Sequence, residues 1–136
     1  MGWSVEEVGG VKVIAVGEAL EGELLSSLVE LVAKLLSEPR LRLVLQLARC
    51  PYVSSEALRF FLQIARRVER QGGRFALAAP KGDVDRALRV SGVSRLVKVV
   101  PSPEELAQET KASEQLARLA ESVLELLARA DGRQPD

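Results

Sequence analysis

The sequence predicts an α/β protein with a mixed but mostly parallel five-stranded sheet, about four helices, a β-hairpin at the start and an extended helix at the end. Two observations support this prediction. Short runs of β-branched and aliphatic residues alternate with amphipathic helical segments along most of the chain, as in parallel sheets joined by helical crossovers. Only two glycines join the first two β-type runs, and so short a connection permits an antiparallel pair alone.

The opening hairpin is the first predicted element. Trp3 to Val8 and Val11 to Val16 are both β-type runs, and Gly9-Gly10 between them accepts the positive φ angles of a tight turn. A helix follows, because leucines and valines recur at helical spacing from Leu24 to Leu36. Pro39 stops this pattern shortly after its last leucine.

The middle of the chain predicts a strand, a helix and a second strand. Leucines alternate with other residues from Leu41 to Leu47, which gives one strongly apolar strand face. The segment from Ser55 to Gln71 has apolar residues on one helical face and ends at Gly72-Gly73, where a left-handed cap forms easily. Arg74 to Ala79 reads as the next strand, so these elements form one crossover unit.

A short helix and a fifth strand complete the predicted sheet. Asp83 can cap the short helix, which reaches Ser91-Gly92. Leu96 to Val100 is rich in β-branched residues and is predicted to be the last strand. The sheet and its helices thus account for about a hundred residues, which fits a single domain of common size.

The final helix has a strong start signal and an unusual length. Ser102 can cap, Pro103 suits the first helical position, and Glu105 completes a capping box. An unbroken helix from there to about Ala130 is roughly 42 Å long, more than one face of a small domain needs. We therefore predict a domain at residues 1–110 and a helical extension with a tail at residues 111–136.

The extension contains an apolar stripe with heptad-like spacing. The residues predicted to serve oligomerisation are Leu116, Ala120, Val123 and Leu127. Other leucines widen this stripe beyond a two-stranded pattern. The helix therefore folds back over its own domain, packs on further copies of the chain, or binds another partner. Residues 111–113 can act as a hinge, and residues 133–136 are expected to fray.

Composition excludes several classes of function. The 19 basic and 19 acidic residues cancel, so no overall field favours nucleic acid or an anionic membrane. The chain has no histidine, which removes the commonest general base and metal ligand, and its one cysteine, Cys50, has no partner for an internal disulfide. No segment is apolar enough to span a membrane, and the start of the chain lacks a signal peptide. We expect a cytoplasmic protein without cofactor, metal or enzymatic activity.

Three segments carry a more specific signal than the order of elements. They are the strand and turn from Leu43 to Val53, the helix start Ser54-Ser55-Glu56-Ala57-Leu58, and the segment from Gly72 to Leu77. In sequence and spacing they resemble the signature segments of the STAS domain family, the fold of bacterial anti-sigma factor antagonists. The resemblance covers roughly residues 11–106 and implies the STAS arrangement of strands and helices.

The sequence departs from the family at the phosphorylation motif. Family members usually open this helix with Asp-Ser-Ser-Gly-Leu or Asp-Thr-Ser-Gly-Leu, and the serine before the glycine is phosphorylated. Here Ser54 replaces the motif aspartate, Glu56 the phosphoacceptor and Ala57 the glycine, while Ser55 keeps its place. Gln46 replaces an aspartate that usually ends the preceding strand. The segments that form the fold are thus retained better than the phosphorylation motif.

The resemblance implies a protein partner, either an anti-sigma factor or a related kinase-like protein. The predicted partner-binding and switch residues are Tyr52, Val53, Ser54, Ser55, Glu56, Ala57 and Arg59. A glutamate cannot accept phosphate, so the usual phosphorylation is expected to be absent. Its permanent charge either mimics a phosphorylated serine or only stabilises the helix start through the macrodipole. Whether Ser54 or Ser55 is phosphorylated instead stays open.

Three functions follow from these observations. The first is a regulator that switches protein partners without chemistry on a substrate. The second is a structural or assembly module that uses the long final helix. The third is an accessory subunit of a membrane transporter, because related STAS domains bind transporters.

Overall fold

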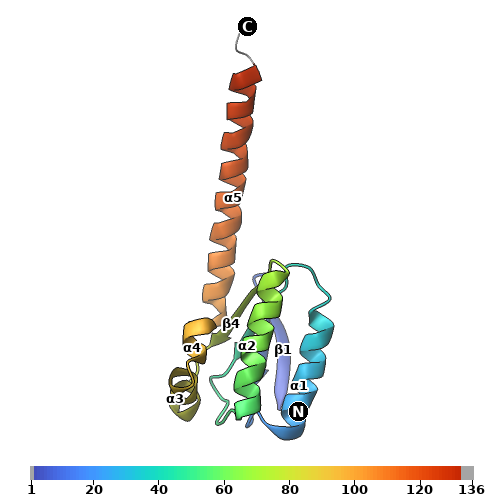
Figure 1. Ribbon diagram of the computed structural model, residues 1–136, viewed down its shortest axis with the longest axis vertical. Helices are drawn as coiled ribbons and strands as arrows, with labels where there is room; N and C mark the ends of the chain where they lie inside the picture. Colours follow the sequence, from blue (N-terminus) through green and yellow to red (C-terminus); the bar gives the residue numbers. More distant parts are fainter. Residues whose placement is uncertain (1, 133–136) are drawn as a thin grey trace.

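Five strands and five helices make up the part of the chain that the structure, a computed structural model, describes, which is residues 2–132 (Figure 1). The strands are β1 (Trp3–Val8), β2 (Val11–Val16), β3 (Arg42–Gln46), β4 (Arg74–Ala78) and β5 (Lys98–Val100). The helices are α1 (Gly22–Leu35), α2 (Ser55–Arg70), α3 (Gly82–Val90), α4 (Val93–Leu96) and α5 (Pro103–Gly132). The tail expected at residues 133–136 lies outside the described residues.

The sheet has the order β1-β2-β3-β4-β5. Strands β1 and β2 form the predicted antiparallel hairpin, and Gly9 and Gly10 have φ angles of 53° and 82° in its turn. Strands β2, β3, β4 and β5 are parallel to their neighbours. The mixed, mostly parallel sheet predicted from the sequence is therefore confirmed.

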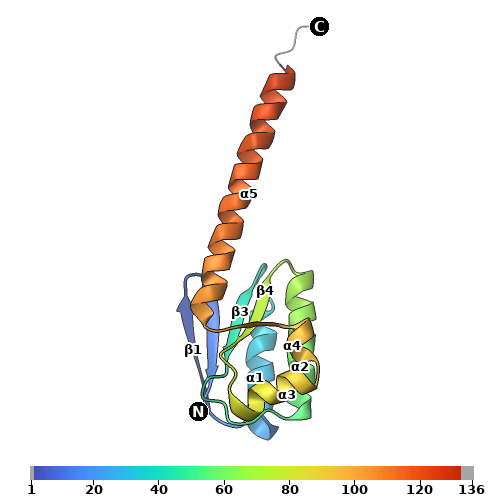
Figure 2. The ribbon, with the colours of Figure 1, turned by 90° about the vertical axis from the view of Figure 1, so that its left-hand side faces the viewer.

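The two faces of the sheet are covered differently. Helices α1 to α4 lie on one face, and the other face is covered by the first turns of α5 (Figure 2). Strand β3 shows why both faces are apolar: Leu43 and Leu45 point to the four helices and Val44 to α5, and all three are fully buried. The core thus has a large and a small part.

The connection from α2 to β4 requires a glycine. A Cβ on Gly73 would lie 2.1 Å from the carbonyl oxygen of Leu41 and 2.8 Å from Cγ1 of Val68. The backbone amide of Gly73 donates to the carbonyl of Val68 over 2.9 Å. The preceding Gly72 has a φ of 79°, as the predicted left-handed cap requires. This tight turn lets α2 pack directly against the sheet.

The structure adds one short helix between α3 and β5. Gly92 has a φ of 84° and starts α4, and the amide of Val97 donates to the carbonyl of Val93 over 2.8 Å. Leu96 therefore ends a helical turn instead of starting β5. At α3 the N-cap residue is Lys81, and Asp83 lies in the first turn, where the macrodipole also favours a carboxylate.

Helix α5 is continuous and leaves the domain (Figures 1 and 2). Leu106 and Thr110 are buried, whereas residues 115–130 are exposed, so α5 does not fold back over its own domain. No break occurs at residues 111–113, because Lys, Ala and Ser are all accommodated in a helix interior. The burial pattern supports the division at residue 110, which stays a prediction.

Two ion pairs hold the base of α5 against the sheet. Arg42 of β3 pairs with Glu114, and Lys98 of β5 pairs with Glu109 over 2.8 Å. Together with buried Leu106 they fix the helix at three points over about two turns. The direction of α5 is therefore set by the domain.

Candidate partner-binding site

The start of α2 is built around Ser54. Its side-chain oxygen accepts a hydrogen bond from the backbone amide of Ala57 over 3.1 Å, which makes Ser54 the N-cap. Ser54 is consequently only 7% exposed. Ser55 and Glu56 follow in the first turn, and both are exposed to solvent. The chain therefore presents a carboxylate at the positive end of the helix dipole.

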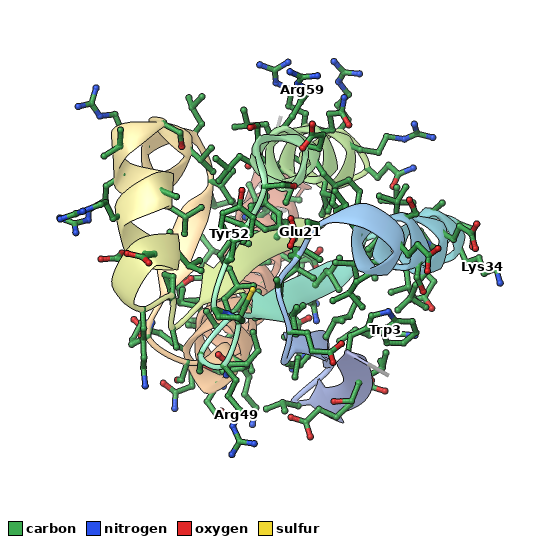
Figure 3. All side chains as sticks on the ribbon, turned by 90° about the horizontal axis from the view of Figure 1, so that it is seen from below. Trp3, Glu21, Lys34, Arg49, Tyr52 and Arg59 are labelled. Carbon is green, nitrogen blue, oxygen red and sulfur yellow. The ribbon has the colours of Figure 1, made fainter. Side chains whose placement is uncertain are left out.

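Two loops are joined beside this helix start. Leu20 and Val53 form an isolated parallel bridge. The amide of Leu20 donates to the carbonyl of Tyr52 over 2.8 Å, and the amide of Ser54 donates to the carbonyl of Leu20 over 3.1 Å. The bridge brings the loop after β2 next to the loop after β3. Glu21 is thereby placed near Tyr52 (Figure 3).

An open groove of about 890 Å³ runs between α1 and α2 at this point. We call it the α1–α2 groove. Its lining residues are Glu21, Gly22, Leu25, Ser26, Val29, Glu30, Tyr52, Ser54, Ser55, Glu56, Phe60 and Gln63. A smaller hollow, which shares Val29 and Phe60, extends it along both helices to Leu36 and Arg67. The groove thus has an acidic end, an apolar middle and a basic far end.

The acidic end is the chemically distinctive part of the groove. Glu21 and Glu56 line it, Glu30 lies farther along α1 beside Val29, and none of the described lining residues of the groove is basic. Beside these carboxylates lie Phe60, which is partly buried, and Val29, which is 38% exposed. Such a surface suits a basic side chain carried on an apolar segment.

The structure separates the predicted site residues into two groups. Tyr52, Ser55 and Glu56 are exposed at the α1–α2 groove, and Tyr52 is 49% exposed. Val53 and Ala57 are buried in the main core and present no side chain to a partner. Arg59 is exposed on α2 but points away from the groove (Figure 3).

The contribution of α1 is absent from the sequence prediction. Gly22, Leu25, Ser26, Val29 and Glu30 line half of the groove. The available signal was Val29, a large apolar residue that lies outside the buried stripe of α1 formed by Leu25, Leu28 and Val32. Its partner Phe60 belongs to another helix, so the sequence alone gave no reason to combine them.

Cys50 has a structural environment. It is buried, and its Sγ lies 3.3 Å from the carbonyl oxygen of Tyr52 and 3.4 Å from that of Glu18. Burial raises the pKa of the Cys50 thiol, and the backbone contacts of its sulfur only partly oppose this. The protonated thiol therefore helps to hold the loop that carries Tyr52.

Gln46 lies outside the α1–α2 groove. Its side-chain oxygen accepts from the amide of Ala48 over 3.3 Å and so closes the turn after β3. It lines a separate hollow of about 380 Å³ with Trp3 and Arg49. Gln46, the last residue of β3, therefore has a structural role in the turn that follows the strand.

Within residues 2–132 no cluster of cysteine, aspartate or glutamate has the arrangement of a metal site. None of the helices in this part of the chain combines the length and apolar character needed to cross a membrane.

Solved structures of several proteins share this fold. A protein from Thermotoga maritima, described as a candidate anti-sigma factor antagonist, has a TM-score of 0.73 and 23% identity over 80% of this chain and 94% of its own. An anti-sigma factor antagonist from Mycobacterium paratuberculosis has a TM-score of 0.66 and 19% identity over 80% of this chain and 92% of its own. The STAS domain of a SulP transporter from Vibrio cholerae has a TM-score of 0.57 and 17% identity over 73% and 82%.

Comparison at the level of sequence gives the family. No curated protein sequence matches the chain significantly. The model of the STAS domain matches residues 2–106, which include the whole sheet, helices α1 to α4 and the first turn of α5. The chain therefore belongs to the STAS domain family.

Proposed function

We propose that this chain is a non-enzymatic, protein-binding regulator of the anti-sigma factor antagonist type, and that it recognises its partner through the α1–α2 groove. One observation carries the proposal. Glu56 is exposed in the first turn of α2, at the rim of a groove that combines carboxylates with apolar side chains. Anti-sigma factors and related kinase-like proteins are the partner class that the family implies.

Glu56 makes binding independent of phosphorylation at the usual position. A phosphoserine there would carry a charge of about −1.5 to −2, whereas glutamate carries a constant single charge. The neighbouring Ser54 is a poor alternative acceptor, because its oxygen is occupied by the cap and the residue is 7% exposed. Ser55 is exposed but occupies a different position in the turn, and phosphoryl transfer depends on accurate placement of the attacking oxygen.

The groove also specifies the chemistry of the partner segment. Glu21, Glu30 and Glu56 require a basic side chain opposite them, because like charges across an interface are destabilising. Val29 and Phe60 require an apolar contact beside it. Tyr52 is half exposed at the same place and has the character of an interface anchor.

Co-purification from native cells tests this proposal. The wild-type chain is compared with Glu56→Gln, Glu56→Ser and the control Glu69→Gln, which removes a carboxylate from the exposed far end of the same helix. We expect Glu56→Gln to weaken capture of a specific partner by about tenfold, as for loss of a charge-assisted contact. Capture should be unchanged for Glu69→Gln. Equal capture by wild type and both Glu56 variants would overturn the proposed site.

Phosphorylation is tested on the same material. The intact mass of the wild-type chain from native cells is expected to show no phosphate, whereas Glu56→Ser restores a hydroxyl at the family's acceptor position and is expected to gain it if the native kinase is present. Stoichiometric phosphate on wild-type Ser54 or Ser55 would contradict phosphate-independent binding.

A further inference from the structure

The distal half of α5 carries the largest unpartnered apolar surface among the described residues. We call it the distal stripe. Its large members are between 52% and 68% exposed and are Leu116, Leu119, Val123, Leu124, Leu126 and Leu127. Isolated exposed leucines are common on protein surfaces, but six large apolar residues within three turns are not. We propose that the distal stripe binds the same stripe of further copies of this chain, in a helical bundle that joins STAS domains.

The spacing of the stripe fits packing between like helices. Leu116, Leu119, Val123, Leu126 and Ala130 are separated by three and four residues in turn, which places them on one seam. Leu127 extends this seam on one side, as Ala120 does one heptad earlier. The stripe thus covers a, d and e positions, with Leu124 at a b position beyond them, a width that buries more fully in a bundle than in a simple two-stranded coil.

The domain leaves this surface free. Leu106 and Thr110, which are buried at the base, lie on a different side of the helix from the centre of the distal stripe, about 110° away at 100° per residue. The ion pairs of Glu109 with Lys98 and of Glu114 with Arg42 hold the base in place. Because α5 continues away from the sheet (Figures 1 and 2), the side chains of the stripe stay exposed to solvent.

The charges favour a second copy as the occupant. Residues 111–130 contain three basic and three acidic side chains, so 3 − 3 gives no net charge: Lys111, Arg118, Arg129, Glu114, Glu121 and Glu125. Two copies therefore do not repel each other. An anionic membrane or a nucleic acid would favour an excess of basic residues on the polar face, which this helix lacks.

The area is sufficient for association. Burying six large apolar side chains on each of two copies removes on the order of 1,000 Å² from solvent, the lower bound of a specific interface, and a bundle of more copies buries more. Self-association is also independent of the α1–α2 groove, which involves none of these residues. This inference therefore does not depend on the proposed partner.

Sedimentation analysis of the full chain tests the proposal. Wild type is compared with Leu126→Glu, which puts a charge in the seam, and with Ala128→Glu, which puts the same charge on the exposed opposite side. Wild type and Ala128→Glu should sediment at a multiple of the 14.8 kDa chain mass. Leu126→Glu should associate at least about tenfold more weakly, because its carboxylate would have to be desolvated.

Two sedimentation results would overturn self-association through this stripe. One is a wild-type chain that stays at 14.8 kDa at every accessible concentration. The other is equal association of wild type and Leu126→Glu, with circular dichroism showing that both are folded. Binding of the wild-type chain to anionic vesicles in place of self-association would indicate a membrane surface as the occupant and would equally reject the proposal.

Discussion

At the scale of single residues, neighbouring side chains at the start of α2 have different roles. Ser54 turns inward and caps the helix, Ala57 fills the core behind it, and Glu56 faces solvent. Ser54 thus serves a structural need, while the charged residue two positions later remains available for contact. This division predicts that stability and binding respond to different substitutions.

Replacement of Ser54 by alanine is expected to lower the free energy of unfolding by about 1 kcal/mol, because the amide of Ala57 loses its hydrogen-bond acceptor. The control is Ser55→Ala, which removes a hydroxyl from the next, exposed position and should change stability by less than about 0.5 kcal/mol. Urea denaturation of the two variants measures both values. Equal losses would show that Ser54 does not act as the cap.

Cys50 predicts a specific dependence of stability on pH. Because burial raises the pKa of its thiol in the folded state, the unfolded chain releases this proton first as the pH rises. Its contribution to stability is therefore complete below the unfolded pKa, near 9.0, and is lost as the pH rises through the folded pKa. The difference in unfolding free energy between wild type and Cys50→Ala should shrink above pH 9.0. A constant difference across that range would contradict the raised pKa.

At the scale of elements, the junctions between helices and strands determine where the groove forms. The turn at Gly72-Gly73 brings α2 down onto β4, and the bridge between Leu20 and Val53 brings the start of α1 beside the start of α2. Each junction depends on backbone contacts. They therefore tolerate little change in backbone geometry.

Gly73→Ala is expected to lower the free energy of unfolding by about 3 kcal/mol, because its Cβ would lie 2.1 Å from the carbonyl oxygen of Leu41 and force the backbone to move. Gly17→Ala is the matched control, since its Cβ would meet only the carbonyl oxygen of Gly2, at 3.9 Å. Its cost should stay below about 1 kcal/mol. Chemical denaturation of both variants gives the comparison, and similar costs would show that the close approach at Gly73 is unimportant.

The sequence could predict features that depend on neighbouring residues, but not features that depend on residues from different elements. Local signals were sufficient to predict the hairpin at Gly9-Gly10 and strand β3. In β3, Leu43 and Leu45 are buried on one face of the sheet and Val44 on the other. The α1–α2 groove has no local signal, because it depends on Val29 and Phe60 from different helices. Helix α4 was missed because it is a single turn in which Val93 favours strands and Ser94 neither state, and the positive φ of Gly92 decides the outcome.

At the scale of the whole molecule, the orientation of α5 is the feature that the sequence predicted least completely. Its periodicity predicted an apolar stripe, but the same stripe suits a helix that folds back and one that projects. The difference comes from contacts at the base of α5, where Leu106 is buried against the sheet and Glu109 and Glu114 form ion pairs with residues far away in the sequence. These contacts direct the helix away from the domain.

The projecting helix predicts that helix content depends on concentration. Residues 115–130 are exposed to solvent, and an isolated helix of this length is only marginally stable in water. Diluting the wild-type protein should therefore reduce its mean helicity in far-UV circular dichroism, as copies separate. Leu126→Glu should show a lower helicity that no longer changes with dilution. A concentration-independent signal for wild type would argue against mutual stabilisation.

The start of α2 and the point where α5 leaves the domain lie at opposite ends of the domain (Figure 1). Copies joined through α5 therefore keep every α1–α2 groove open and pointing outward. A partner that is itself dimeric can then engage two grooves at once, so its second contact forms at a raised effective concentration without any new interface. In the proposed bundle, the direction of α5 determines how many grooves a partner can reach, so contacts that are weak singly give strong binding only to partners of matching geometry.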